Sequence, residues 1–362
     1  MAPVATSPAP SSVPLVHQSE DVVKNIKAKL AAARNGNSSD VAAVDEEAVH
    51  AKPDGQKLDE VSDAVDAVNE YLGEHRDVSV PRDHDDEWRA AKSKFDEEKD
   101  KEAFRNYEDA ADHVKALYRE QHEKQTVAFN IAAREKYLGK VHARMTVWEA
   151  IEKLDSLVDE SDPDTELSQI QHLLQTAEAM RRDGRPDWMQ LTGLLHDLGK
   201  LMCFFGAEGQ WDVVGDTFVV GAKFSEKCVY PDTFDANPDA HDARYNTELG
   251  MYKRGCGLDN IMLSWGHDEY MYWRLKAQTT IPEAGLDMIR FHSCYPMHRD
   301  GEYRQFFAPG DEQKMTNVIA FNAYDLYSKS DDPPDPVKLR PYYEAIIDKY
   351  VPNGGRHAVL EW

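Results

Sequence analysis

The sequence of 362 residues has little of several features that mark particular classes of protein. It has four cysteines, none paired as C-x-x-C, which argues against a zinc knuckle or a disulfide framework and favours a reducing, cytoplasmic compartment. No apolar run approaches the roughly 18 residues of a transmembrane helix, and the Ala/Ser/Pro-rich N-terminus lacks the pattern of a secretory signal. No G-x-G-x-x-G motif follows a predicted strand, so nothing indicates a nicotinamide or flavin cofactor.

Basic residues are also scarce relative to acidic ones. The chain has 42 Lys and Arg against 66 Asp and Glu, a formal net charge of −24. Such a charge disfavours binding to a nucleic acid or to an anionic membrane surface. It offers no attraction for an anionic substrate, so a small neutral ligand is easier to accommodate.

The character of the chain changes at about residue 104. Residues 1–103 are predicted to be an N-terminal extension, partly disordered, with short amphipathic helices at about 22–30 and 61–72 and a densely charged segment after them. From there helical patterns follow one another, and we predict one all-α domain at 104–362 with a long loop region around 206–246. Helices are expected at 107–136, 146–158, 166–182, 187–205, 247–253, 260–265, 268–275, 282–292, 311–329 and 341–350, and short strands at 217–220 and 227–230.

The stretch 191–202 places a polar cluster on a helix that is apolar around most of its circumference. Its leucines and Met202 recur at helical spacing, which predicts a buried helix. His196, Asp197 and Lys200 are spaced i, i+1, i+4 and would share one stripe of an α-helix. A base, an acid and an ammonium group there need a partner or a metal. A core histidine satisfied by its neighbour is the alternative interpretation.

Further histidines and an aspartate lie on apolar helical patterns elsewhere. Each alone has a structural explanation; Asp325, for example, is placed for an i,i+4 ion pair with Lys329. Taken together they are six nitrogen and oxygen ligands without a thiolate: His172, His196, Asp197, His267, His292 and Asp325. A single catalytic metal commonly takes three protein ligands, so six suit two metals, and Asp197 could offer one oxygen to each. This ligand set favours iron, manganese or zinc.

The order of these six residues resembles that of the myo-inositol oxygenase family, a member of the HD-domain superfamily. Flanking words also match, and the resemblance runs from about residue 104 to Trp362 with little interruption; the matching words lie at 104–107, 157–164, 193–200, 214–218, 247–252, 264–270, 290–293, 325–327 and 339–343. The resemblance implies an all-α, HD-domain-like helical bundle with short β-hairpin and loop insertions. It also implies a non-haem di-iron centre, Fe(II)/Fe(III), that uses O2 as co-substrate to cleave myo-inositol to D-glucuronate, the first step of inositol catabolism.

The resemblance assigns roles to individual residues as well. One iron would be held by His172, His196 and Asp325, and the second by His267 and His292, with Asp197 bridging the pair. Lys200 and Asp197 would be catalytic. Substrate contacts are implied for Arg105, Asp159, Ser161, Asp162, Lys200, Gly215, Asp216, His292, Ser293 and Lys329.

Simple chemistry supports some of these roles and leaves alternatives open. A neutral polyol needs hydrogen-bond partners, which Asp159, Ser161 and Asp216 can supply; the alternative is turn chemistry at 159–162 and at Gly215. We expect Lys200 to stabilise a substrate alkoxide, and the alternative is an ion pair with Asp197 or a neighbouring acid.

Two other functions compete with the oxygenase interpretation. A metal-dependent phosphohydrolase of the HD type would need several cations or a glycine-rich anion site, and the local cations are only Lys200, Arg105 and Lys329. A non-catalytic scaffold would bind no iron. We predict a monomeric oxidoreductase with two irons, O2 and myo-inositol as partners, no nucleic acid and no membrane.

Overall fold

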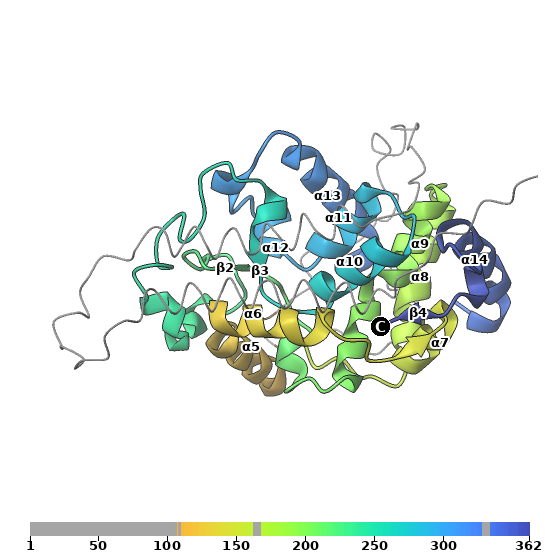
Figure 1. Cartoon of the computed structure of the whole chain (residues 1–362), viewed down its shortest axis with the longest axis horizontal. Coiled ribbons are helices and arrows are strands. Elements are labelled where there is room, and N and C mark those ends of the chain that lie inside the picture. The colour runs from red at the N-terminus through yellow and green to blue at the C-terminus, as the bar shows by residue number, and fades with distance from the viewer. Residues whose placement is uncertain (1–106, 108–109, 162–167, 328–333) are drawn as a thin grey trace, which may run out of the picture.

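The structure, a computed structural model, describes residue 107 and residues 110–161, 168–327 and 334–362 (Figure 1). The predicted N-terminal extension, with its short helices, lies outside the described residues. Arg105, Asp162 and Lys329 also lie outside them. In the described part of the chain, no helix combines the length and the apolar character needed to cross a membrane.

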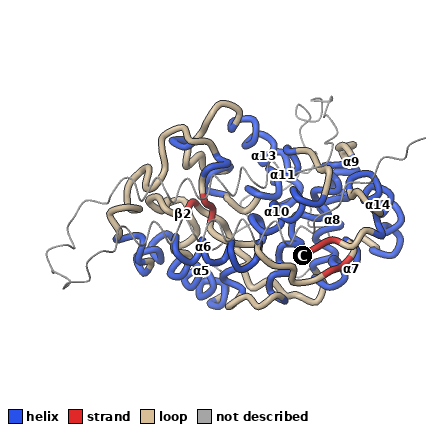
Figure 2. Tube along the Cα trace, viewed as in Figure 1, coloured by secondary structure: helices blue, strands red, loops and turns tan. Residues whose placement is uncertain are grey.

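Helices dominate the described residues, which confirms the all-α prediction (Figure 2). The α-helices are α5 (Asp112–Lys124), α6 (Val127–Leu138), α7 (Val147–Leu154), α8 (Gln169–Arg182), α9 (Asp187–Leu195), α10 (His267–Gln278), α11 (Glu283–Phe291), α12 (Tyr295–His298), α13 (Asp311–Tyr327) and α14 (Pro336–Tyr350). The 3₁₀ helices are η2 (His196–Phe204), η3 (Gln210–Asp212), η4 (Pro231–Ala236), η5 (Pro238–His241), η6 (Leu258–Asn260), η7 (Arg304–Phe306) and η8 (Gly355–His357). Two small antiparallel sheets pair β1 (Arg144–Met145) with β4 (Leu360–Glu361) and β2 (Val219–Val220) with β3 (Met262–Leu263).

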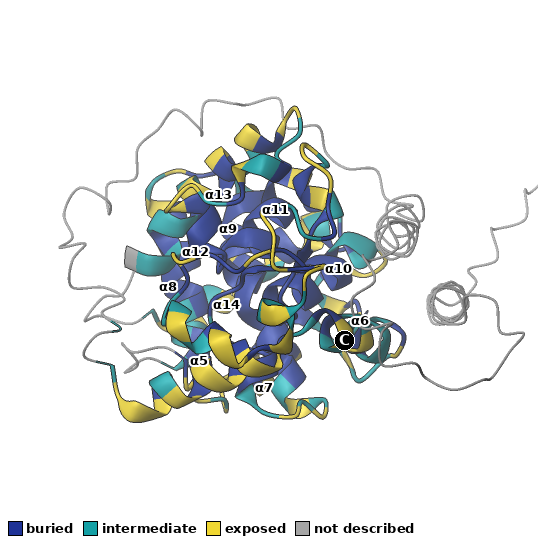
Figure 3. Cartoon of the chain, turned by 90° about the vertical axis from the view of Figure 1, so that its left-hand side faces the viewer, coloured by how far each residue is buried: buried dark blue, intermediate teal, exposed yellow. Residues whose placement is uncertain are grey.

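The centre of the fold is a bundle built from α8, α9, η2, α10, α11 and α13. In this bundle α8 packs against α9, η2 against α10, α10 against α11, and α11 against α13. Fully buried apolar residues such as Leu173, Leu194, Leu198, Met271 and Leu286 fill the space between several of these helices. Figure 3 shows this buried interior running through α9, α10 and α11. Polar side chains that point inward from these helices are therefore held by dense packing.

The helix predicted at 107–136 is two helices, because the chain turns at Gln125 and Thr126. The Thr126 hydroxyl accepts the Phe129 N–H at 3.1 Å and caps α6. The fully buried Gln125 amide donates to the Trp265 carbonyl at 2.7 Å, and its oxygen accepts the Trp265 N–H at 3.0 Å. The break thus fastens α6 to the segment that leads into His267.

The helices predicted at 247–253 and 260–265 are wrong, and so is the strand at 227–230. Residues 247–253 form turns and bends, where Gly250 has a φ of +56° and lies too close to the Gly221 carbonyl for any Cβ. Met262 and Leu263 form β3 because they pair with β2, which falls within the strand predicted at 217–220. Residues 227–230 form a turn and bends that end on Tyr230, whose φ is +48°.

Candidate metal centre

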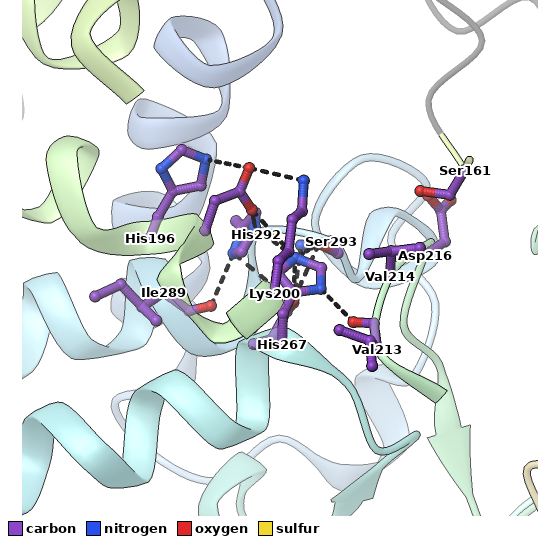
Figure 4. Close-up of polar contacts among 12 residues, drawn as sticks. Ser161, His196, Lys200, Val213, Val214, Asp216, His267, Ile289, His292 and Ser293 are labelled. Carbon is purple, nitrogen blue, oxygen red and sulfur yellow. Dashed lines mark hydrogen bonds and ion pairs between the residues drawn. The ribbon is translucent and has the colours of Figure 1, made fainter. Parts of the chain in front are cut away.

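Six polar side chains from five helical segments meet in the buried interior. They are His172 from α8, His196 and Asp197 at the start of η2, His267 at the start of α10, His292 directly after α11, and Asp325 near the end of α13. Figure 4 shows the imidazoles of His196, His267 and His292 grouped beside Lys200. Their ligand atoms form three overlapping triplets, and the atoms of each triplet lie within 4.8 Å of one another. They make up two sets, one for each metal position. The structure therefore brings together all six residues that the sequence singled out as ligands.

The first set surrounds one position from four directions. Nε2 of His172 and Nε2 of His196 lie 3.3 Å apart. Oδ1 of Asp325 is 3.1 Å from the His172 nitrogen and 3.2 Å from the His196 nitrogen. Oδ2 of Asp197 is 3.4 Å from both nitrogens. Two imidazoles and two carboxylates thus converge on one point.

The second set shares the Asp197 carboxylate with the first. Nε2 of His267 and Nε2 of His292 lie 3.3 Å apart. Oδ1 of Asp197 is 3.4 Å from the His267 nitrogen and 3.6 Å from the His292 nitrogen. Since the two oxygens of one carboxylate face different imidazole pairs, Asp197 stands between two adjacent positions, as a bridging ligand would.

These separations have the size expected between ligands of one cation. Metal–nitrogen and metal–oxygen bonds of about 2.0–2.2 Å, opened by about 90° to 110°, place neighbouring ligand atoms about 2.8–3.6 Å apart. Within the two sets, the distances from nitrogen to nitrogen or oxygen run from 3.1 to 3.6 Å. The six residues present therefore fit a pair of metal ions.

Three of the imidazoles have their lone pairs directed into the centre. Nδ1 of His196, His267 and His292 lies 2.8 Å from the carbonyl oxygens of Gly193, Val213 and Ile289, respectively. A carbonyl oxygen only accepts, so each Nδ1 carries the proton and each Nε2 of a neutral ring is an acceptor. Two acceptor nitrogens 3.3 Å apart repel each other unless a cation lies between them.

Electrostatics at the centre also favour positive charge. Burial lowers the pKa of His172 and His292, but neighbouring carboxylates raise both to about 9. Burial raises the pKa of Asp197 and Asp325, yet the His196 imidazole lowers both to well below their usual range. A bound cation would balance the negative charge of these carboxylates, and the imidazoles could then stay neutral.

Lys200 is placed by a 3₁₀ helix, not by the continuous α-helix predicted at 187–205. Residues i and i+3 eclipse in a 3₁₀ helix, so Lys200 lies over Asp197. The predicted α-helical geometry is wrong, but His196, Asp197 and Lys200 do meet as the sequence predicted. Its Nζ is 2.8 Å from Asp197 Oδ2 and 2.7 Å from Asp159 Oδ2. Burial lowers the pKa of Lys200, but the two carboxylates raise it by more, to well above its ordinary value. Lys200 is thus a charged link between the centre and Asp159.

Gly199 allows η2 to lie directly against the start of α10. A Cβ on Gly199 would lie 2.1 Å from the His267 carbonyl oxygen and 2.7 Å from the carbonyl carbon. The obstacle is backbone, which cannot rotate away as a side chain does. Our reading of the sequence did not single out Gly199, although an isolated glycine within an apolar helical pattern is a known signal of close packing.

Replacing Gly199 with Ala should therefore push η2 away from α10. We expect a loss of about 1–3 kcal/mol in the free energy of unfolding, together with weaker metal binding because His267 moves away from Asp197. Calorimetry and metal analysis of the purified variant measure both effects. Gly193→Ala is the control, since its Cβ would meet the flexible Met180 side chain at 3.2 Å and the Ala177 backbone nitrogen at 3.3 Å. Unchanged stability and metal content in Gly199→Ala would contradict this account.

Asp159 and Ser161 belong to the segment after α7 and are connected to Lys200, Asp159 directly and Ser161 through Asp159. Oδ1 of Asp159 accepts the Ser161 N–H at 2.8 Å and the Ser161 hydroxyl at 2.6 Å, while Oδ2 receives Lys200. The backbone bond is the turn chemistry that the sequence left as an alternative. The same turn nevertheless connects both polar side chains to Lys200.

Gly215 lies in a bend beside α5, and Asp216 follows it. Gly215 has a φ of +92°, which favours glycine. The Tyr118 hydroxyl donates to Asp216 Oδ1 at 3.2 Å, and the Gln121 amide donates to the Asp216 carbonyl at 3.2 Å. Sequence reasoning missed Tyr118 and Gln121, because their roles depend on contacts more than 90 residues away in the chain.

Ser293 contacts the centre through a residue that the sequence analysis passed over. Its hydroxyl lies 3.3 Å from His267 Nε2 and donates to Asp268 Oδ1 at 3.1 Å, while its N–H donates to Asp268 Oδ2 at 3.2 Å. Asp268 Oδ1 is also 2.8 Å from His267 Nε2. His267-Asp268 repeats the dyad His196-Asp197, and that repetition was an available signal.

Known proteins resemble this chain over a range that includes all six ligands. The family model described as "Myo-inositol oxygenase" matches residues 111–362. "Inositol oxygenase" of Homo sapiens is 47% identical over 270 residues, which cover 73% of this chain and 92% of that protein. "Inositol oxygenase" of Dictyostelium discoideum is 44% identical over 269 residues, covering 72% and 92%. "Probable inositol oxygenase" of Oryza sativa subsp. japonica is 47% identical over 267 residues, covering 72% and 85%.

Proposed function

Because the chain belongs to the myo-inositol oxygenase family, we propose that it cleaves the ring of myo-inositol with O2 and forms D-glucuronate. The observation that carries this proposal is the Asp197 carboxylate, whose two oxygens face two different imidazole pairs. Myo-inositol is neutral, which suits a protein of net charge −24. The HD-type phosphohydrolase that the sequence left as an alternative is not favoured by the family match.

The cofactor of this reaction would be two iron ions per chain. His172, His196 and Asp325 would hold one, His267 and His292 would hold the other, and Asp197 would bridge them. When bound, the iron pair supplies the one-electron chemistry by which O2 is reduced. The substrate itself provides all four electrons, so no flavin or nicotinamide is needed.

The protein's own residues would bind and orient the polyol next to this centre. Lys200 donates hydrogen bonds from a buried ammonium and can stabilise a hydroxyl oxygen that loses its proton. Asp159 and Asp197 both hold that ammonium. The Ser293 hydroxyl donates its proton to Asp268 Oδ1. Its oxygen would therefore accept a hydrogen bond from a substrate hydroxyl.

The other predicted substrate contacts belong to the same proposal. Each offers a hydrogen-bond partner or a close approach to a polyol hydroxyl: Arg105, Asp162, Ser161, Gly215, Asp216, His292 and Lys329. Those with described positions lie in turns or next to the centre.

The domain arrangement and the cellular setting extend the proposal. Residues 104–362 would form the catalytic domain, in agreement with the family match at 111–362, and residues 1–103 would precede it as an extension. All six ligands come from one chain, so a monomer suffices. No disulfide joins the four cysteines, which suits a reducing cytoplasm.

The full chain, reconstituted with iron under anaerobic conditions, tests the proposed activity directly. On addition of O2 and myo-inositol we expect one glucuronate for each O2 consumed. Nucleotides supplied in place of inositol are the control and should release no phosphate. Phosphate release without O2 uptake would replace this proposal with the hydrolase alternative.

A further inference from the structure

A network of alternating charges, fully buried only at Glu269 and Arg290, lies behind the second pair of histidines. It contains three cations and three anions in contact order, Arg134, Glu269, Arg290, Asp259, Lys314 and Asp287. These residues come from α6, α10, α11, η6 and α13. Part of this charge network thus connects the helices that carry His267, His292 and Asp325.

The most deeply buried ion pair of this network joins α10 to α11. Arg290 Nε donates to Glu269 Oε1 at 2.5 Å, and both side chains are almost completely buried. Arg134 donates to the other Glu269 oxygen at 3.1 Å and to the Leu263 carbonyl at 2.9 Å. Trp273 Nε1 donates to that same oxygen at 3.3 Å. The Glu269 carboxylate therefore has cations on two sides and leaves neither oxygen without a donor.

Glu269 lies two residues after His267, and Arg290 lies two residues before His292. Two residues of helix turn the chain by about 200°, so both members of the ion pair face away from the centre. The two histidines meet on one side of the α10–α11 contact, with their Nε2 atoms 3.3 Å apart. The two ions meet on the opposite side. The ion pair is thus a second fixed contact between the same two helices.

We infer that Glu269 and Arg290 are positioning residues that set the separation of His267 and His292 and thereby the affinity of the second metal position. This inference rests on the proposed di-iron centre. A buried ion pair is weak evidence of stability, because desolvation offsets most of its attraction. Its demanding geometry suits a role in alignment, since a carboxylate and a guanidinium bind only at a defined distance and angle.

Removing the charge of Glu269 should weaken the second position selectively. Glu269→Gln leaves Arg290 and Arg134 facing each other without their shared carboxylate, and α10 should shift away from α11. We expect Fe(II) affinity at the second position to fall about 10- to 100-fold while the first position is unchanged. Glu269→Asp, which keeps the charge, should recover part of the loss.

Anaerobic Fe(II) titration of the full chain by equilibrium dialysis gives the number of irons bound and two stepwise affinities without measuring turnover, so selective weakening appears as a fall in one affinity only. Glu178→Gln is the matched control: Glu178 is also buried and accepts from Arg181 and Tyr343, but it joins α8 to α14. It should lose comparable stability and keep both affinities. Equal weakening of both positions in Glu269→Gln, or the same pattern in Glu178→Gln, would overturn the inference. A single iron in the unaltered chain would overturn the di-iron proposal and this inference with it, whereas two tightly bound irons in Glu269→Gln would overturn the inference alone.

Discussion

Asp197→Asn is expected to abolish turnover and to lower the iron content of the purified protein. An amide keeps the shape of the side chain but replaces one carboxylate oxygen with an NH2 group that cannot bind a cation. It also removes the negative charge that serves both imidazole pairs and Lys200. A loss of about 4 kcal/mol in transition-state stabilisation would lower the rate roughly a thousandfold.

Iron analysis and glucuronate formation on the same preparation measure this effect. Asp239→Asn is a suitable control, because Asp239 is a partly buried aspartate that accepts the Val127 N–H at 2.6 Å and an Asn oxygen can still accept it. The control should keep its iron and its activity. An Asp197→Asn protein with two irons and full turnover would show that the carboxylate does not bridge.

The six candidate ligands could be named from the sequence because each is a polar residue in an apolar helical pattern. A buried imidazole or carboxylate is costly without a partner, so its place in such a pattern is itself informative. The order of the six residues from His172 to Asp325 matches that of the myo-inositol oxygenase family, and this match assigned all six to one metal centre. The repeated His-Asp dyad could have drawn attention to Asp268, but the sequence could not assign a task to Asp268 or Glu269, because only the contacts with Ser293 and Arg290 distinguish them.

The departures from the predicted fold have a common cause in contacts between distant segments. Helix periodicity extends through 187–205, yet η2 is a 3₁₀ helix packed with Gly199 against the His267 backbone. Met262 and Leu263 suit a helix by pattern, but pairing with β2, more than 40 residues earlier, makes them a strand. Local propensity is overridden wherever a backbone group finds a partner elsewhere in the chain.

Lys200→Met is expected to reduce turnover by about 10²- to 10³-fold, the range of a positioned proton donor or charge stabiliser. Methionine fills a similar volume but donates no hydrogen bond. The ammonium bridges Asp197 and Asp159, so its loss removes the donor next to any substrate oxygen at the centre. The iron content should change far less than turnover, because Lys200 is not itself a ligand.

The variant leaves the buried Asp159 carboxylate without its cation, which by itself can destabilise the protein by about 3–5 kcal/mol. The double variant Lys200→Met with Asp159→Asn removes that unpaired charge and separates folding from catalysis. If Lys200 acts on the substrate, the double variant should regain thermal stability while kcat stays low. Restored turnover in the double variant, or loss of iron in the single one, would assign Lys200 a structural role in holding the bridging carboxylate.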